Sequence, residues 1–388
     1  MGKEVMTPAN AGNNGGTLSN LRNHARRGFL KRAGLALAGT SASTILSASK
    51  KESERASNGG AGRCTTEVRV PMRDVSGKVA FITGGSSGIG LGLARAFTDA
   101  GMKVVIGYRT KEHLDEAMKL LGSASDRVHA INVDVTDRGG MEAAAEETVR
   151  VFGKVHMLVN NAGITMMSRL SETSYEDWDW LVGVNLNGVF NGIRAFLPRI
   201  KTQGEGGQIV ATSSVLGLFA TGEQGGYCAT KYALVGLMEA LRDELSDTNI
   251  GVSVCCPGLV KSNIFDAYRN RPGHTHDLKP DHGMQRLREL MNDPQSAMDP
   301  LEAGRRVLQG VRSNNMYIFT HPEYEPWLKD RNDALIASIR SDLHSFGADA
   351  PTKERISSHR TVRSLYTAER DHRLCDLAES QRITKSAS

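Results

Sequence analysis

The stretch "ATSSVLGLFATGEQGGYCATKYALVG", from Ala211 to Gly236, holds the residues whose types and spacing most suggest chemistry. Lys231 follows Tyr227 by four residues, so both side chains project from one face if 225–247 is a helix. A free phenol has a pKa of about 10, which is poorly matched to proton exchange near neutral pH. A neighbouring ammonium favours the tyrosinate and lowers that pKa, so the pair could serve as a general acid or base. The same spacing is common between ordinary surface residues of a helix, so the pair needs support from its surroundings.

A glycine-rich turn supplies the first support. The sequence "TGGSSGIG", Thr83 to Gly90, directly follows a short apolar run and directly precedes a helical pattern. Gly84, Gly88 and Gly90 let the backbone turn tightly and approach a phosphate, which would then lie at the positive end of the next helix. Loops often contain glycine for other reasons, but the position between a strand and a helix favours phosphate binding here.

The central sequence alternates between apolar, β-branched runs and segments of helical periodicity. Such alternation predicts an α/β fold of the Rossmann type, a doubly wound parallel sheet of about seven strands in a single domain spanning 76–345. Ligands of such sheets bind beyond the carboxyl ends of the strands. The expected strands are 78–83, 103–108, 128–133, 155–160, 207–213, 251–256 and 316–320, and the expected helices include 88–100, 111–122, about 174–200 and 225–247.

Six motifs occur in the order in which one protein family has them. They are "TGGSSGIG", "NNAG" at 160–163, Asn185 in "VGVNLNG", Ser214, "YCATK" at 227–231 and "PGLVKS" at 257–262. Over about residues 76–320 the sequence therefore resembles the short-chain dehydrogenase/reductase family, in its single-domain Tyr-x-x-x-Lys branch. The resemblance implies an NAD(P)-dependent alcohol dehydrogenase or carbonyl reductase, which interconverts an alcohol and a ketone or aldehyde by hydride transfer.

The resemblance also implies catalytic roles for Asn185, Ser214, Tyr227 and Lys231. Tyr227 would be the general acid/base, and Lys231 would in addition hydrogen-bond the nicotinamide ribose. Ser214 would donate a hydrogen bond to the substrate oxygen, because the family's spacing to the tyrosine selects it over Ser213. Asn185 would hold a water that links Lys231 to solvent and so supplies protons.

The cofactor contacts implied by the resemblance lie at the ends of several strands. Asp134 resembles the family's acidic contact to the adenine amine, although it could merely cap the helix that follows Thr136. Ser262 stands where the family usually has threonine and keeps the hydroxyl. The expected cofactor-binding residues are Thr83, Gly84, Ser86, Ser87, Gly88, Ile89, Gly90, Tyr108, Arg109, Asp134, Val135, Asn161, Ala162, Gly163, Tyr227, Lys231, Pro257, Gly258, Val260 and Ser262.

The end of the second strand bears on the choice of nucleotide. Relatives that prefer NAD carry an acidic residue there, which binds the 2′-hydroxyl. This sequence has Tyr108 followed by Arg109, so no carboxylate repels a 2′-phosphate and a guanidinium can bind it. We therefore expect NADP, with NAD as the alternative if Arg109 is merely exposed to solvent.

The charge distribution and the cysteines argue against several other classes of protein. Residues 1–63 hold ten Lys/Arg and three Asp/Glu, and residues 350–388 hold eight and five, so the net charge of +5 leaves 64–349 at −5. An acidic central region offers no electrostatic footprint for nucleic acid. The five cysteines are odd in number and lack C-x-x-C spacing, so we expect neither a disulfide framework nor a zinc site.

The ends of the chain differ in composition from its centre. Residues 1–49 include "ARRGFLKRAGLALAG", whose Arg26-Arg27 pair resembles a twin-arginine export signal. The apolar stretch behind it is shorter than the roughly 20 apolar residues that span a bilayer, so we expect no stable membrane insertion. The signal predicts a periplasmic protein, with a cytoplasmic protein bearing a basic tail as the alternative. We expect 50–75 to be a linker and 346–388 to be a disordered tail.

Residues 263–300 interrupt the alternation, and in the family such an insertion is a lid over the substrate. His274, His276 and His282 lie in it, but their Pro-, Gly- and Asp-rich surroundings favour a flexible polar lid over a metal site. The stretches "DWDWLVGVNLNGVFNG" and "GVSVCCPGLVKSNI" are similar to dehydrogenases that oxidise the benzylic alcohol of lignin-derived aryl ethers. That similarity suggests an aromatic or bulky alcohol or carbonyl substrate.

The resemblance further implies a homodimer or homotetramer, assembled through the helices at about 174–200 and 225–247. A nucleotide-sensing binding module on the same fold is an alternative function, and the intact set of Asn185, Ser214, Tyr227 and Lys231 argues against it. A sugar-nucleotide epimerase or dehydratase is a second alternative, but the sequence has no obvious room for its larger C-terminal substrate domain.

Overall fold

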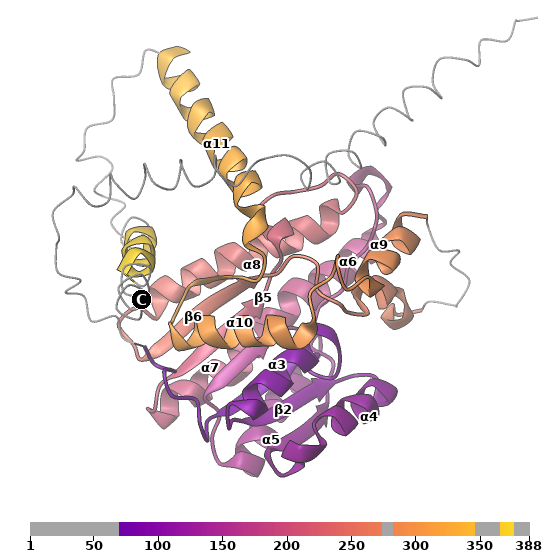
Figure 1. Ribbon diagram of the computed structural model, residues 1–388, viewed down its shortest axis with the longest axis vertical. Coiled ribbons are helices and arrows are strands. Elements are labelled where there is room, and N and C mark those ends of the chain that lie inside the picture. Colours follow the sequence, from indigo (N-terminus) through magenta and orange to yellow (C-terminus); the bar gives the residue numbers. More distant parts are fainter. Residues whose placement is uncertain (1–69, 274–281, 346–364, 376–388) are drawn as a thin grey trace, which may run out of the picture. The chain divides into compact units, whose positions relative to one another are not determined.

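A seven-stranded parallel sheet lies at the centre of the part of the chain that the structure describes (Figure 1). The structure is a computed structural model that describes residues 70–273, 282–345 and 365–375, all of which belong to one compact unit. The strands are β1 (Val79–Thr83), β2 (Lys103–Tyr108), β3 (Val128–Asn132), β4 (Met157–Asn160), β5 (Gly207–Thr212), β6 (Ile250–Cys256) and β7 (Tyr317–Phe319). Every expected strand is present, and each end agrees to within two residues.

The order of the strands reverses at the centre of the sheet. Across the sheet the order is β3-β2-β1-β4-β5-β6-β7, and every neighbouring pair is parallel. The chain therefore winds outward from β1 in one direction and from β4 in the other. The loops after these two strands diverge, and dinucleotides bind at such a switch point. The expected doubly wound Rossmann-type sheet is confirmed.

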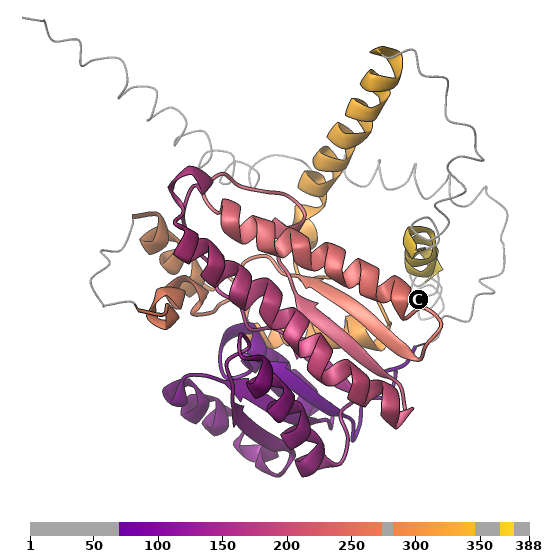
Figure 2. The same cartoon turned by 180° about the vertical axis from the view of Figure 1, so that it is seen from behind.

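Helices cover both faces of the sheet, as the front and back views show (Figures 1 and 2). Helices α3, α4 and α10 pack on one face, and α5, α7 and α8 pack on the other. The helices are α3 (Gly88–Asp99), α4 (Lys111–Leu120), α5 (Arg138–Phe152), α6 (Tyr175–Val182), α7 (Gly188–Gln203), α8 (Gly225–Glu244), α9 (His282–Asn292), α10 (Pro300–Arg312) and α11 (Glu325–Ser345). A further helix is formed by residues 365–375.

The core consists of two apolar layers, one on each face of the sheet. Successive residues of a strand point to opposite faces, so Phe81 and Leu158 join the layer under α5, α7 and α8, while Ile82 and Val159 join the layer under α3 and α10. All residues of β1 and β4 are buried, which explains why these strands are continuous apolar runs in the sequence.

The helix expected at about 174–200 is divided in two by a π-helical turn. α6 ends at Val182, residues Gly183–Asn187 form the π turn, and α7 begins at Gly188. Such turns are rare and occur often at functional sites. Asn185 lies in the middle of this one and is completely buried.

The segment expected to be a lid is partly helical where the structure describes it. Of 263–300, residues 274–281 lie outside the described residues, and with them His274 and His276. The remainder contains α9, and its far end is fastened to the loop after β6 because Lys261 N donates to Met298 O and Met298 N donates to Leu259 O, both at 3.0 Å.

The expectation that 346–388 is disordered is wrong for residues 365–375, which form a helix packed on the domain. Glu369 accepts a hydrogen bond from the Met316 backbone N–H at 2.8 Å, and Tyr366 donates one to Glu239 on α8 at 2.7 Å. Cys375 in this helix is disulfide-bonded, which the sequence did not suggest.

The expected export signal at 1–49 and nearly all of the expected linker at 50–75 lie outside the described residues. Among the helices that are described, none is both long enough and apolar enough to cross a membrane.

Candidate active site

Tyr227 and Lys231 lie one turn apart on α8, and both are buried. The helix begins at Gly225, so Tyr227 stands in its first turn, next to the loop that follows β5. Lys231 Nζ lies 5.5 Å from the centroid of the Tyr227 ring. Tyr227 is 8% exposed and Lys231 is 3% exposed, so this is not the ordinary surface pair that the same spacing also allows.

The protonation of the pair differs from the expectation that Lys231 acidifies the phenol. Burial raises the pKa of Tyr227 to about 12, and the Ser214 hydroxyl opposes that shift only in part. Burial also lowers the pKa of Lys231 to about 8. Lys231 Nζ donates to Thr212 O at 2.8 Å, and the ammonium does not contribute to the shift in the pKa of Tyr227. Desolvation therefore outweighs the attraction between the two groups.

The two adjacent serines have different surroundings. Ser214 follows β5, is 7% exposed, and interacts through its hydroxyl with the phenol of Tyr227. Its Oγ also accepts a hydrogen bond from Leu216 N at 3.1 Å, which fixes the direction of the side chain. Ser213 instead donates to the backbone oxygen of Lys231 at 2.8 Å and so fastens α8 to the sheet. Of the two, Ser214 is the one that the structure brings to the phenol.

Asn185 joins the π turn to two other parts of the site. Its Oδ1 accepts from Ile164 N at 2.9 Å, and its Nδ2 donates to Ile164 O at 3.0 Å and to Thr230 Oγ1 at 3.1 Å. Both N–H groups of the amide are thus used, so a water on Asn185 would need the second lone pair of Oδ1 or the main-chain carbonyl. Thr230 is a contributor that the analysis of the sequence did not single out, although it lies within "YCATK".

Gly163 keeps open a space between Asn185 and Lys231. A Cβ at this position would lie 3.3 Å from Asn185 Oδ1 and 3.5 Å from Lys231 Nζ. Two polar side chains therefore approach one point above the backbone of residue 163. A small polar group of a cofactor or a water fits the chemistry of that point.

The glycine-rich turn contacts two of the other motifs. Gly84 and Gly88 have φ angles of +63° and +50°, which favour glycine. A Cβ on Gly84 would lie 3.0 Å from the Cα of Ala162, and one on Gly88 would lie 2.7 Å from Ser262 Cβ. The structure thus brings the turn together with the "NNAG" and "PGLVKS" segments.

Hydrogen bonds accepted by Thr83 hold the "NNAG" segment against the turn. Thr83 Oγ1 accepts the backbone N–H groups of Asn161 at 2.9 Å and of Ala162 at 3.0 Å. Asn161 Nδ2 donates in return to Thr83 O at 3.1 Å and to Gly84 O at 3.3 Å. The carboxyl ends of β1 and β4, on either side of the switch point, are thereby fixed to each other.

The first turn of α3 suits a pyrophosphate. Ser87 is the N-cap residue, but its side chain makes no capping hydrogen bond, and the first turn has no acidic residue. The positive end of the helix dipole and its unpaired N–H groups are therefore not neutralised by the chain itself. Together with the glycine turn, these features fit the phosphates of a dinucleotide.

Arg109 and Asp134 form an ion pair at the expected adenosine end of the site. Arg109 Nη1 lies 3.3 Å from Asp134 Oδ2, and both side chains are partly exposed. The other carboxylate oxygen of Asp134 accepts from Thr136 N at 2.9 Å and from Thr136 Oγ1 at 2.8 Å. The helix cap itself is Asp137, so Asp134 is not the capping residue of α5. The pairing of Arg109 with Asp134 was not foreseen from the sequence.

The remaining expected contacts lie on two loops. Val135 follows β3 and packs on the π turn and α7, where its carbonyl accepts from Asn191 Nδ2 at 2.9 Å.

Pro257 O accepts from Val215 N at 3.0 Å, which ties the loop after β6 to the loop that carries Ser214. Val260 pairs with Met298 in an isolated parallel bridge. Gly258 N donates to His321 Nδ1 at 3.1 Å, and no motif in the sequence pointed to that histidine.

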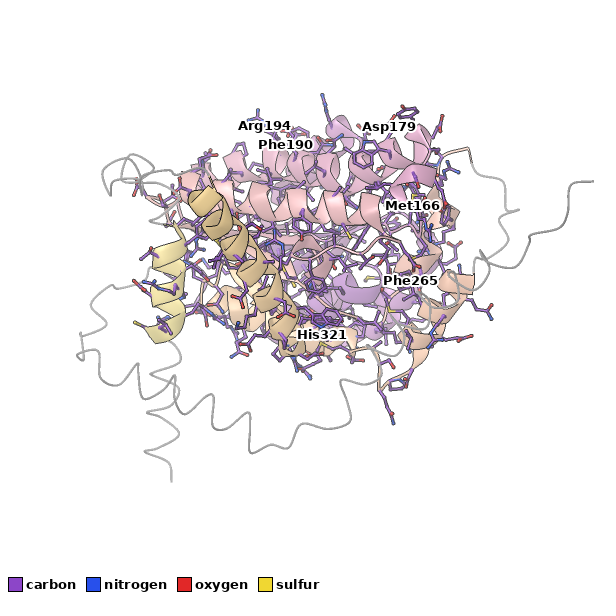
Figure 3. The ribbon with its side chains drawn as sticks, turned by 90° about the horizontal axis from the view of Figure 1, so that it is seen from above. Met166, Asp179, Phe190, Arg194, Phe265 and His321 are labelled. Carbon is purple, nitrogen blue, oxygen red and sulfur yellow. The ribbon has the colours of Figure 1, made fainter. Side chains whose placement is uncertain are left out.

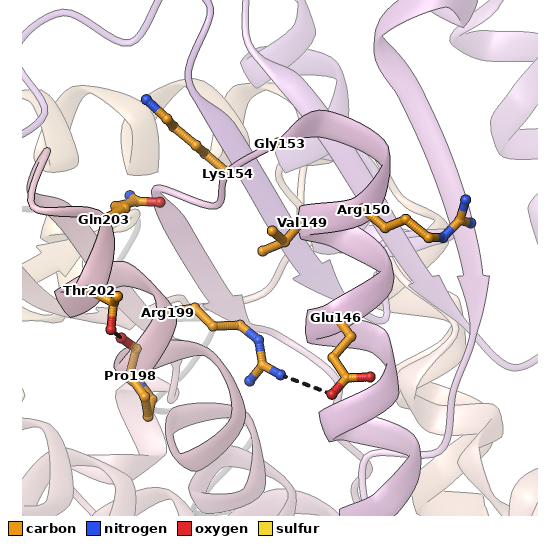
Figure 4. A pocket seen from close by; sticks show the side chains of 9 residues that line it. All are labelled: Glu146, Val149, Arg150, Gly153, Lys154, Pro198, Arg199, Thr202 and Gln203. Atoms are coloured by element: carbon orange, nitrogen blue, oxygen red, sulfur yellow. Dashed lines mark hydrogen bonds and ion pairs between the residues drawn. The ribbon is translucent and has the colours of Figure 1, made fainter.

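A pocket of about 590 Å³ lies away from all of these residues (Figure 4). It is formed where α5 and α7 end, near the start of β4, which is the opposite end of the sheet from the loops described above. Its charged residues all have ion-pair partners: Arg199 lies 2.8 Å from Glu142 and 3.5 Å from Glu146, Arg150 pairs with Glu147, and Lys154 pairs with Glu205. None of the expected catalytic or cofactor residues lines it.

Comparison with known proteins agrees with the geometry. A family model described as short chain dehydrogenase matches residues 78–273. The C alpha-dehydrogenase of Sphingobium sp. (strain NBRC 103272 / SYK-6) is 37% identical over 269 residues, which are 69% of this chain and 88% of that protein. The NADP-dependent (R)-specific alcohol dehydrogenase of Lentilactobacillus kefiri is 36% identical over 194 residues, 50% of this chain and 77% of that protein.

A solved structure of a short chain dehydrogenase/reductase from Burkholderia phymatum, in complex with NAD, is also similar. It has a TM-score of 0.63 and 31% sequence identity, covering 68% of this chain and 96% of that one. The match in sequence and the match in fold therefore extend over the same domain. This chain belongs to the short-chain dehydrogenase family, and it is an NAD(P)-dependent alcohol dehydrogenase or reductase.

Proposed function

We propose that this protein interconverts an alcohol and a ketone or aldehyde with NADP as its cofactor, and that Tyr227 is the general acid/base. The observation that carries the proposal is the buried group of Ser214, Tyr227 and Lys231 at the carboxyl ends of the strands. When bound, the nicotinamide would supply or accept the hydride.

Tyr227 is suited to give a proton to the oxygen of a carbonyl that is being reduced. With a pKa of about 12 the phenol is in its acid form at neutral pH, but this pKa lies further from neutrality than that of a free phenol, so transfer of the proton needs positive charge nearby to lower it. Ser214 would donate a hydrogen bond to the same oxygen and stabilise the negative charge that develops there. In the oxidising direction Tyr227 must first lose its proton, which a positive charge brought close to the phenol would favour.

Lys231 and Asn185 are suited to replace the proton that Tyr227 gives away. Lys231 has a pKa of about 8, so it holds a proton at neutral pH and releases it more readily than an exposed lysine. Asn185 Oδ1 and Lys231 Nζ both approach the point that Gly163 leaves open. A water at that point would connect the ammonium to Asn185 and onward to solvent.

The preference for NADP rests on Arg109. Its side chain is 46% exposed and follows the end of β2, where a 2′-phosphate of the adenosine ribose would lie. One relative is named NADP-dependent and one similar structure contains NAD, so the family accommodates both nucleotides. The guanidinium and the lack of a carboxylate at the end of β2 favour the phosphorylated one here.

We propose an aromatic or bulky substrate, on the grounds of similarity to the C alpha-dehydrogenase from Sphingobium. We also propose a homodimer or homotetramer assembled through α7 and α8. Phe190 on the outer side of α7 is 52% exposed, and Figure 3 shows it beside Arg194 on that face. Contiguous apolar patches on a surface mark protein–protein interfaces, and in this proposal Phe190 belongs to one.

We further propose that the protein is exported by the twin-arginine route and works in the periplasm, from the Arg26-Arg27 sequence alone. Because that route carries folded proteins, the nucleotide could leave the cytoplasm already bound. The protein purified from a periplasmic extract would then contain nucleotide, and a nucleotide-free protein would argue against this account.

The central test is a panel of ketones and alcohols, assayed through nicotinamide absorbance with NADP(H) and NAD(H) in parallel. Tyr227→Phe should retain nucleotide binding while kcat falls by about 10²–10⁴, the usual contribution of a general acid. Tyr232→Phe is the matched control, since Tyr232 lies on the same helix with its ring under Arg331. Undiminished turnover by Tyr227→Phe would eliminate the mechanism.

A further inference from the structure

His321 is a buried histidine that no step of the proposed mechanism uses. It lies two residues after the end of β7, is 7% exposed, and stands at the base of α11 (Figure 3). The loop Pro257–Ser262 follows β6, which is the neighbour of β7 in the sheet. Because β6 and β7 are parallel, the segments that follow them leave the sheet at the same end and meet.

The contact between these segments is a hydrogen bond with a defined direction. Gly258 N donates to His321 Nδ1 at 3.1 Å, and Thr320 Oγ1 lies 2.6 Å from the same nitrogen. An N–H aimed at Nδ1 requires a lone pair there, so the ring is neutral and carries its proton on Nε2. Burial lowers the pKa of His321, and of the charged neighbours Glu323 opposes this shift while Arg306 adds to it.

The rings of His321 and Tyr324 also lie directly on the backbone of Gly258. A Cβ at Gly258 would lie 2.5 Å from Tyr324 Cε2 and 2.8 Å from His321 Cγ. The absence of a side chain at residue 258 is what allows this contact. The segment after β7 therefore fixes both the position of the loop and the direction of its N–H group.

The same segment reaches the loop that carries Ser214. Phe219 lies in that loop, and its ring centroid is 5.8 Å from that of Tyr324 and 5.3 Å from that of Trp327. The rings of Tyr324 and Trp327 are themselves 5.3 Å apart in an edge-on arrangement. Packing of this kind stabilises the contact. The residues 321–327 thus join the two loops that would flank the reacting atoms.

We propose that His321 is a positioning residue, which holds Gly258 through its backbone N–H and so sets the placement of the nicotinamide relative to Tyr227. The inference rests on the proposed function, because it takes Pro257–Ser262 as the loop beside the nicotinamide. We therefore expect His321 to affect kcat and the binding of the nicotinamide half of the cofactor. It should not affect the binding of the adenosine half.

The test compares His321→Asn, His321→Gln and His321→Ala. The amide oxygen of Asn can take the place of Nδ1, whereas that of Gln reaches the place of Nε2. For each variant we would measure kcat, KM and the affinities for NADPH and for 2′-phospho-ADP-ribose, which lacks the nicotinamide. A misplacement of about 1 Å can cost on the order of 10²-fold in rate. We expect His321→Ala and His321→Gln to lose about 10- to 100-fold in kcat and to weaken NADPH but not 2′-phospho-ADP-ribose, with His321→Asn recovering most of the loss.

His156 provides a matched control at the other end of the sheet. It is 4% exposed, and its Nδ1 accepts the Val79 backbone N–H at 3.1 Å, so the chemistry of the contact is the same. His156→Ala should lower the melting temperature while leaving kcat and both affinities of the folded enzyme unchanged. If His321→Ala fails to fold, the contrast between His321→Asn and His321→Gln carries the test.

Three results would overturn the proposal. They are equal rates for His321→Asn and His321→Gln, equal weakening of both ligands by His321→Ala, and wild-type rates in all three variants. If the wild-type protein transfers hydride but these variants behave in one of these ways, only the positioning role falls. If the wild-type protein binds neither ligand, the proposed function falls together with it.

Discussion

At the scale of single residues, Arg109 is held by a partner that a nucleotide could replace. The pair with Asp134 has a separation of 3.3 Å and both members are partly exposed, so it contributes at most about 1 kcal/mol to stability. A 2′-phosphate offers more negative charge and more acceptor oxygens than the carboxylate does. If Arg109 exchanged Asp134 for the phosphate, the loss of the ion pair would therefore cost little free energy. Asp134 would then be free to contact the adenine.

We expect Arg109→Gln to raise the KM for NADPH about 10-fold or more and to leave the KM for NADH nearly unchanged. The physical reason is the loss of a charge-assisted hydrogen bond, typically about 1.5–3 kcal/mol, from one of the two nucleotides only. Steady-state kinetics with both nucleotides checks this. Arg150→Gln, an exposed arginine at the end of α5, is the control, and an equal loss with NADH would contradict the assignment.

The candidate catalytic residues could be selected from the sequence, but their protonation could not. Spacing and motif order selected Ser214, Tyr227 and Lys231, and the structure brings these three together. The pKa of Tyr227 depends on how deeply α8 is buried and on where Lys231 points. Both are tertiary properties, so i,i+4 spacing alone does not predict that burial raises the pKa of the phenol.

At the scale of elements, the strands were predictable because the central ones are buried on both faces. β2 was located without error, and even the three-residue β7 was recognised from its apolar run. The π turn at Gly183–Asn187 was missed, since helical periodicity passes through it without a proline. The helix at 365–375 was missed because its composition is polar, and its order comes from Glu369 and His372, which find partners on the domain.

His156 joins three elements and gives the fold a dependence on pH. Its Nδ1 accepts from Val79 at the start of β1, and its Nε2 lies 2.9 Å from Glu205, which follows α7. Burial lowers the pKa of His156, with Lys78 and Lys154 adding to the shift and Glu205 opposing it. The folded state therefore binds this proton less readily than the unfolded state does.

We expect neutral His156 to make its full contribution to the free energy of unfolding above about pH 6.5, the usual pKa of histidine. Below that pH the unfolded state binds the proton more readily, so the free energy of unfolding should fall. His156→Asn keeps an acceptor for the Val79 N–H but cannot titrate. Its stability should therefore fall less steeply between about pH 6.5 and 5 than that of the wild-type protein. Urea unfolding at a series of pH values measures this, and parallel slopes for the two proteins would refute it.

At the scale of the whole molecule, β7 is the edge strand of the sheet. The helix at 365–375 is hydrogen-bonded to the residue that precedes β7 and to two neighbouring helices. Tyr366 bonds Glu239 on α8, Glu369 bonds Met316, and His372 Nε2 lies 2.8 Å from Ser313 O at the end of α10. The helix thus joins parts of the chain that are about 50 residues or more away in sequence. A sheet ending in a short strand benefits from such a cover, because exposed strand edges favour association with other chains.

We expect Glu369→Ala to loosen this helix, with Cys375 still disulfide-bonded, while the active site stays intact. Glu369 is 8% exposed, and its removal leaves the N–H of the fully buried Met316 without its partner, a loss of about 1–3 kcal/mol. Amide hydrogen exchange in 365–375 should accelerate and the melting temperature should fall, with kcat unchanged.

Arg370→Ala is the control, because Arg370 is exposed and pairs only with the adjacent Asp371 among the described contacts. Its effect on the free energy of unfolding should stay within about 0.5 kcal/mol. Slow exchange persisting in the Glu369→Ala helix would show that other contacts hold it, and that the carboxylate of Glu369 is not the latch.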